Sequence, residues 1–177
     1  LALADIYLSQ RKETEAYKQL DLAFKCSDVD IDTKMKILIK IHESSSKIDP
    51  VVYELVNELV LDHPEEAKAH SIRGDYLLRA NKEEAALKAY KMALNYDETL
   101  FPIWNQVLIM EYQAKKYEEL FDDSKECMLL YPSIAVVYLL NGVSANQLKK
   151  YNVAVDVLSV GVELVVNDNP VKAEFYG

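Results

Sequence analysis

The stretch HSIRGDYLLRANKEEAALKAYKMAL, from His70 to Leu94, decides the fold of this 177-residue chain. Its apolar residues recur at spacings of three and four, which is typical of amphipathic helices. Asn81 interrupts the pattern and favours the left-handed conformation that ends a helix before a tight turn. Gly74 lies inside the first helix, where it costs about 1 kcal/mol relative to alanine. We expect close contact between Gly74 and Ala86 to offset this cost, because small residues let two antiparallel helices approach.

The pattern repeats with a period of about 34 residues, and a period of this length indicates a repeat architecture. Gly74 and Gly142 lie two periods apart, and His70, Trp104 and Tyr138 fill one bulky column of the same frame. We predict one solenoid over 1–177, as a fragment of a longer chain, with repeats at about 1–30 (incomplete), 31–66, 67–100, 101–134 and 135–169, and the start of a further helix at 170–177.

Each repeat is predicted to form two amphipathic helices, so the expected fold class is all-α. The first helices are expected at about 1–9, 31–43, 66–79, 100–113 and 134–147, and the second helices at about 13–26, 50–62, 83–96, 117–130 and 151–166. Asp49 before Pro50, and Asn169 before Pro170, have the cap and first-turn chemistry of helix starts.

Three segments, 69–97, 103–132 and 137–164, resemble tetratricopeptide repeats, because several columns recur together at the right period. The resemblance covers nearly the whole chain. It implies a right-handed superhelix of antiparallel helix pairs, with the first helices lining a concave groove that suits a peptide or a partner helix. The chain departs from the family pattern at Glu98, where proline is usual, and at Leu108 and Leu120, which fill two small places.

Composition restricts the classes of partner. The net charge is −9, with 29 acidic and 20 basic side chains, so the chain as a whole would be repelled by nucleic acid and by anionic membrane surfaces. No apolar run approaches the roughly 20 residues that cross a bilayer. The chain opens at Leu1 without an initiator methionine, so cytoplasmic and cell-envelope locations are both open. Cys26 and Cys127 are too few for a disulfide framework, and we expect both thiols to be packed.

Family geometry implies which side chains face the groove. The candidate contacts are Met35, Ile39, His42, Lys68, Ser71, Asp75, Asn105, Ile109, Tyr112, Leu139, Val143 and Asn146. Asn105, Tyr112 and Asn146 are the favoured ones, because an amide can pair with a ligand's backbone. The lysine, asparagine and arginine clamp by which some family members hold chaperone tails is not expected, because its places hold residues such as Ser71, Asp75, Gln106, Val136 and Leu140.

Catalytic and metal sites are not expected. His63, Glu66 and His70 lack the ligand spacing of a zinc motif, and acidic pairs such as Glu83 and Glu84 lie where helix starts favour negative charge. We therefore expect no enzyme, no metal and no cofactor. The leading hypothesis is a protein-interaction scaffold that binds a peptide or partner helix. The alternative is a spacer or self-association module of a larger regulatory or cell-envelope protein, associating end to end through uncapped repeats.

Overall fold

The computed structural model describes residues 1–10, 12–26, 28–45, 47–165 and 169–175. All regular structure in these ranges is helical, which confirms the predicted all-α class. The chain divides into two compact units, Leu1–Asp97 and Glu98–Gly177, here called unit 1 and unit 2. One continuous solenoid over 1–177 stays a prediction.

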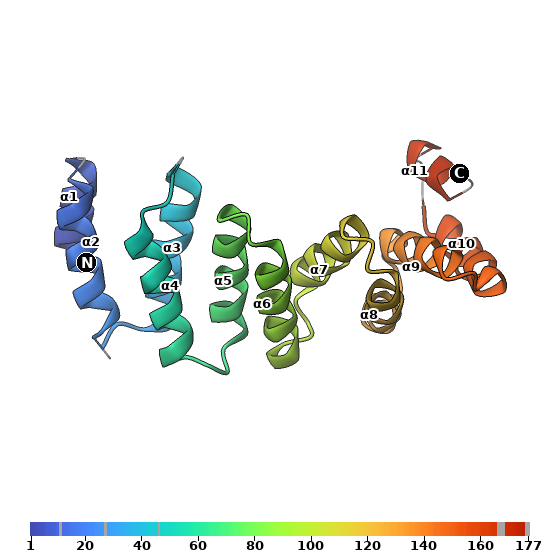
Figure 1. The fold of residues 1–177 in the computed structure, drawn as a ribbon, viewed down its shortest axis with the longest axis horizontal. Coiled ribbons are helices and arrows are strands. Elements are labelled where there is room, and N and C mark those ends of the chain that lie inside the picture. The colour runs from blue at the N-terminus through green and yellow to red at the C-terminus, as the bar shows by residue number, and fades with distance from the viewer. Residues whose placement is uncertain (11, 27, 46, 166–168, 176–177) are drawn as a thin grey trace. The chain divides into compact units, whose positions relative to one another are not determined.

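Unit 1 is built from helix pairs that follow one another in chain order (Figure 1). Its described helices are α1 (Ala2–Ser9), α2 (Glu13–Phe24), α3 (Ile31–Ser44), α4 (Pro50–Asp62), α5 (Ala67–Arg79) and α6 (Glu83–Tyr96). The apolar stripes of α1 to α5 meet in one core, to which Leu20, Leu38, Leu59 and Tyr76 each contribute a side chain that is at most 2% exposed. The Tyr76 hydroxyl donates to the carbonyl of Leu38 at 2.7 Å and ties α5 to α3.

Unit 2 repeats the arrangement with α7 (Phe101–Gln113), α8 (Tyr117–Leu130), α9 (Ala135–Gln147), α10 (Tyr151–Glu163) and the short α11 (Asn169–Glu174) (Figure 1). In this unit α8 packs on α7 and α9, α9 packs on α7 and α10, and the short helix follows. Every predicted helix start from α2 to α10 lies within one residue of the observed start.

Two second helices end earlier than predicted, because tight backbone turns close them. In α2 the amide of Cys26 donates to the carbonyl of Ala23 at 3.2 Å, and the helix ends at Phe24. In α10 the amide of Leu164 donates to Gly161 at 3.1 Å, and the helix ends at Glu163. Hydrogen bonds from an amide to the carbonyl three residues earlier satisfy carbonyls at the end of a helix. The predicted end of α10, residue 166, lies outside the described residues.

Both helix starts that were predicted from a cap followed by proline are present. The Asp49 carboxylate accepts from the amide of Val51 at 2.9 Å, and Pro50 is the first residue of α4. The last helix begins at Asn169, ahead of Pro170, although the side chain of Asn169 is outside what the structure describes. The cap at Asp49 is therefore confirmed, whereas Asn169, which was predicted to precede the last helix, is its first residue.

Three of the turns between paired helices share one backbone conformation. Asn81, Lys115 and Lys149, which occupy the same column of successive repeats, have φ values of 56°, 57° and 60°. The residue after each of these three donates its amide to the carbonyl five residues earlier, as Lys82 does to Leu77 at 2.9 Å. Together with the bond from Asn81 to the carbonyl of Leu78 at 2.9 Å, this is a Schellman motif. The left-handed conformation predicted at Asn81 is confirmed, and it recurs at two lysines.

The bulky column of the repeat serves as a hydrogen-bond donor column. The side-chain nitrogen of Trp104 donates to the carbonyl of Glu98 at 2.8 Å, and the Tyr138 hydroxyl donates to that of Pro132 at 3.0 Å. His70 makes the matching contact, from Nε2 to the carbonyl of Pro64 at 2.7 Å. In each case the acceptor lies six residues before the donor, so each bond fixes the loop that leads into a first helix.

The small residues are contact points, and the side chain nearest to Gly74 is that of Tyr90. A Cβ at Gly74 would lie 2.5 Å from Cε1 of Tyr90, so the Tyr90 ring fills this space. The predicted contact with Ala86, which is fully buried, stays a prediction. Gly142, two repeats later, is filled in the same way by Leu158, with Cδ2 at 2.5 Å from the added Cβ. In both places a glycine on the first helix therefore faces one large side chain of the second helix. The tyrosine ring or the leucine occupies the space that a Cβ on the glycine would take.

Candidate functional site

In unit 2 the predicted contacts form two matching rows on the first helices. Asn105, Ile109 and Tyr112 lie on α7, and one repeat later Leu139, Val143 and Asn146 occupy the same positions on α9. The two helices pack against each other. Tyr112 is 46% exposed and Asn146 is exposed, whereas the other four are half-buried.

The polar groups of these rows are available to a ligand. Within the part of the chain that the structure describes, the side chains of Asn105, Tyr112 and Asn146 make no hydrogen bond to another residue. An amide offers both donors and acceptors, and a tyrosine adds a large apolar ring with a polar tip. The rows can therefore bind a peptide backbone and an apolar side chain at once.

In unit 1 the predicted contacts on α3 are partly used for packing. Met35 packs against the core, and Ile39 is 41% exposed. The His42 ring packs edge-on against Tyr76 with 5.2 Å between ring centroids. Its Nε2 is buried and has no hydrogen-bond partner in the described part of the chain, so His42 leaves one polar atom unsatisfied.

Two of the three predicted contacts on α5 already have partners. The Lys68 ammonium lies 2.8 Å from the Asp32 carboxylate of α3, which raises the pKa of Lys68 through this hydrogen bond. Both side chains are more than half exposed, so solvent weakens the pair. Ser71 is half-buried.

Asp75 accepts a hydrogen bond from the Tyr90 hydroxyl of α6 at 2.6 Å. Burial raises the pKa of the Asp75 carboxyl, although the Tyr90 bond and nearby His42 oppose this. Burial and the same bond both raise the pKa of the Tyr90 hydroxyl. The sequence predicted Asp75 as a groove residue but did not predict its hydrogen bond to Tyr90. The one signal available in the sequence was that Tyr90 occupies the column opposite Gly74.

Arg79, at the end of α5, was also missed by sequence reasoning. Its guanidinium donates to the carbonyls of His42 and Ser45, at the C-terminal end of α3. A cation at this end complements the partial negative charge of the helix terminus. Arg79 therefore joins the two first helices that carry the predicted contacts of unit 1.

The histidines and cysteines have structural surroundings. His70 also stacks on Tyr96 with 5.4 Å between ring centroids, and no group of three metal-ligating side chains occurs among the described residues. Cys127 is buried, which raises the pKa of its thiol to about 12. Cys26 is exposed, so the prediction that both thiols are packed is wrong for this residue. It lies just beyond the end of α2, where no neighbouring helix covers it.

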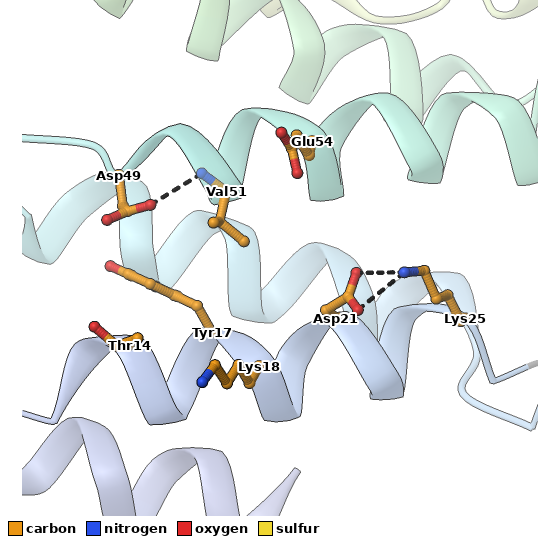
Figure 2. A pocket seen from close by; sticks show the side chains of 8 residues that line it. All are labelled: Thr14, Tyr17, Lys18, Asp21, Lys25, Asp49, Val51 and Glu54. Carbon is orange, nitrogen blue, oxygen red and sulfur yellow. Dashed lines mark hydrogen bonds and ion pairs between the residues drawn. The ribbon is translucent and has the colours of Figure 1, made fainter.

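A polar pocket of about 380 Å³ lies between α2 and α4, and Figure 2 shows the side chains that line it. Asp49 caps α4, and the Asp21 carboxylate is 2.8 Å from the Lys25 ammonium. Tyr17 lies beneath Asp49, and burial raises the pKa of its hydroxyl. Two of its three acids are engaged in a helix cap and an ion pair, and the third, Glu54, is exposed at its edge, so the pocket is mainly a structural seam between two second helices.

Among the described residues, no helix is long and apolar enough to cross a bilayer. No family model matches the sequence, and no curated protein matches it. Solved structures do match. A crystal structure of MamA aligns with a TM-score of 0.66 at 13% identity over 92% of this chain and 94% of that chain. A second MamA structure, from AMB-1, gives 0.67 at 15% identity over 96% and 92%.

Naa15, in the structure of Naa15/Naa10 bound to HypK-THB, gives a TM-score of 0.67 at 13% identity over 94% of this chain and 25% of that chain. At such identities the likeness is one of fold, and both proteins are helical repeats of the predicted type. The fold is a tetratricopeptide repeat solenoid.

The tetratricopeptide repeat frame explains why the glutamate at position 98 is tolerated. Trp104 bonds to the carbonyl of Glu98, as Tyr138 does to that of Pro132, and the side chain of the acceptor residue takes no part. Of the other two departures, Leu108 and Leu120 are both fully buried, at 1% and 0% exposure. Two large side chains therefore fit within unit 2, where Ser124 and Cys127 are the small neighbours on α8.

Proposed function

We propose that this chain is a non-catalytic protein-interaction scaffold that binds a peptide or a partner helix along its first helices. The observation that carries the proposal is the pair of matching rows on α7 and α9, where amide and phenol groups stay at the surface without hydrogen-bond partners in the described chain. Asn105 and Asn146 occupy different columns of the repeat, and neither side chain ties its helix to a neighbour through a hydrogen bond in the described chain. They suit a ligand that runs across successive helices and offers a peptide group to each.

Unit 2 supplies the stronger part of this site. In unit 1 the corresponding polar side chains are engaged, since Lys68 pairs with Asp32 and Asp75 with Tyr90. A ligand would have to displace these bonds before it could use the same groups. On α7 and α9 a ligand has only water to displace, so each new hydrogen bond contributes its ordinary net value of about 1 kcal/mol. We therefore place recognition on Asn105, Tyr112 and Asn146.

The proposal is tested by affinity capture with quantitative mass spectrometry, comparing the chain with the double variant Asn105→Ala, Tyr112→Ala. Neither substitution touches the core, so both proteins should fold alike by circular dichroism. The matched control is Leu61→Gln on α4, a second-helix residue that is 78% exposed. Proteins held by the first-helix rows should be lost from the double variant and kept by the control. Capture that is the same for all three proteins would refute the site.

A further inference from the structure

A second surface, on the outer helices of unit 2, has the form of a docking groove. A hollow of about 460 Å³ lies between α8 and α10, with a mainly apolar lining. Met128, Tyr138 and Val157 are half-buried within it. Leu129 and Val160 stand at its edges, 78% and 51% exposed. Large apolar side chains gathered at the surface in this way mark an interaction site.

The hollow is already formed in the unbound chain. Tyr138 is held at both ends, because its hydroxyl donates to the carbonyl of Pro132 at 3.0 Å and its Cβ packs against Gly161. A Cβ on Gly161 would lie 2.7 Å from the Cβ of Tyr138, so only glycine lets α10 approach this closely. A groove that needs no rearrangement loses little conformational entropy when it is filled, which favours binding.

The charges around the groove are mainly acidic. Asp156 lines it from α10, and Glu163 follows two turns later on the same helix. On α8, Glu118 and Asp122 lie two turns and one turn before Lys125, at the spacing that places them on one face. All five side chains are exposed, and Lys125 forms no ion pair with Asp156 in the described part of the chain. The lining itself therefore carries one acid and one base, Asp156 and Lys125, and the other three acids lie farther along the two helices. A second base, Lys150, lies near the same end as Asp122, with its ammonium 3.7 Å from the centre of the Phe121 ring.

We propose that the groove between α8 and α10 docks a basic amphipathic helix of a partner protein. The apolar stripe of that helix would fill the hollow and cover Leu129 and Val160. Its lysine or arginine side chains would pair with the acids along both walls. The net charge of −9 adds long-range attraction for such a partner and repels a second copy of this chain. This surface lies on second helices, so it is separate from the proposed site on the first helices.

The repeat provides an internal comparison. In unit 1 the positions that match Tyr138, Asp156 and Val160 are occupied by His70, Lys88 and Met92. A lysine thus stands where unit 2 has the acid, and it pairs with Glu84 at 3.6 Å. This exposed lysine disfavours a basic helix at these positions of unit 1, so Met92 serves as a matched control position.

The probe is a fluorescein-labelled synthetic helix of leucine and lysine, about 18 residues or roughly five turns long, with a scrambled peptide of the same composition as its reference. Fluorescence anisotropy should show tighter binding of the amphipathic peptide than of the scrambled one, by roughly tenfold or more. The double variant Leu129→Gln, Val160→Gln should lose that difference, and Asp156→Lys should weaken binding. Met92→Gln should bind like the unaltered chain.

Three outcomes would overturn the proposal. Equal binding of the scrambled peptide would show that charge alone attracts the probe, and unchanged binding by the Leu129 and Val160 variant would show that the probe binds elsewhere. Sedimentation velocity on the free chain gives the third. A dimer that the double variant abolishes would show that a second copy covers the groove. The substituted residues are exposed, so circular dichroism should report the same helix content for every variant.

Discussion

The substitution Gly74→Ala should destabilise unit 1, although alanine is ordinarily the better helix former. The added Cβ would lie 2.5 Å from Cε1 and 2.7 Å from Cδ1 of Tyr90. That ring cannot move aside, because it is 1% exposed and its hydroxyl is bonded to Asp75. Overpacking of this kind costs about 1–3 kcal/mol, whereas the better helix propensity returns about 1 kcal/mol. We expect a net loss of about 1 kcal/mol.

Gly142→Ala is the matched substitution in unit 2 and should be tolerated better. Its Cβ would lie 2.4 Å from Cγ of Leu158, so Leu158 must adopt another χ1 rotamer, which is open to it because it is half-buried and has no hydrogen bond to hold it. The helix propensity gain of about 1 kcal/mol should offset the cost of this change, so we expect a net effect near zero. The two glycines occupy one column of the repeat and differ in their neighbour alone.

Urea unfolding of the intact chain checks both values. Circular dichroism reports all helices, and the fluorescence of Trp104, the one tryptophan in the sequence, reports unit 2. Gly74→Ala should lower the dichroism midpoint, and Tyr90→Leu added to it should recover part of the loss. Gly142→Ala should leave the fluorescence midpoint nearly unchanged. If Gly74→Ala were tolerated as well as Gly142→Ala, packing of the Tyr90 ring could not be the cause.

Three further predictions follow from buried groups. Because burial raises the pKa of Asp75 above its unfolded value, the ionised carboxylate destabilises the fold above that raised pKa and has no effect well below the unfolded value of 3.8. Asp75→Asn should therefore stabilise the chain at pH 7, by an amount that shrinks as the pH of the urea titration falls to 4. Arg79→Met should cost about 1–3 kcal/mol by urea unfolding, since two carbonyls at the end of α3 lose a charged donor. A thiol reagent should label Cys26 at once and Cys127 only in urea, because the second thiol is buried and its pKa is about 12; equal rates in the folded chain would contradict this.

Most of the fold could be predicted because the repeat period fixes many features together. Helix starts, the cap at Asp49 and the left-handed turn at Asn81 each follow from a residue type at a known place. Lys115 and Lys149 were not predicted to be left-handed, since lysine carries no such preference. The repeat frame could have predicted this conformation, because both lysines lie in the same column as Asn81.

The candidate site was less predictable, because sequence position shows which helix face a side chain occupies and not what it touches. Asp75 falls on the predicted first-helix face and yet bonds to Tyr90 of the next helix. That bond depends on the reach of the Tyr90 ring across Gly74, which is a property of the packed pair. For the amides on α7 and α9 the family resemblance indicated the helix face, and the structure leaves Asn105 half-buried and Asn146 exposed.

The hydrogen bonds of His70, Trp104 and Tyr138 have a consequence for how such a chain can evolve. Their acceptor is a backbone carbonyl, which every amino acid supplies, so the acceptor position tolerates any substitution that keeps the loop. The donor position accepts several rings with a polar tip. Each of these hydrogen bonds therefore restricts the residue type at the donor position only loosely, and at the acceptor position hardly at all. A repeat held together in this way can change its sequence widely while its helices keep their places.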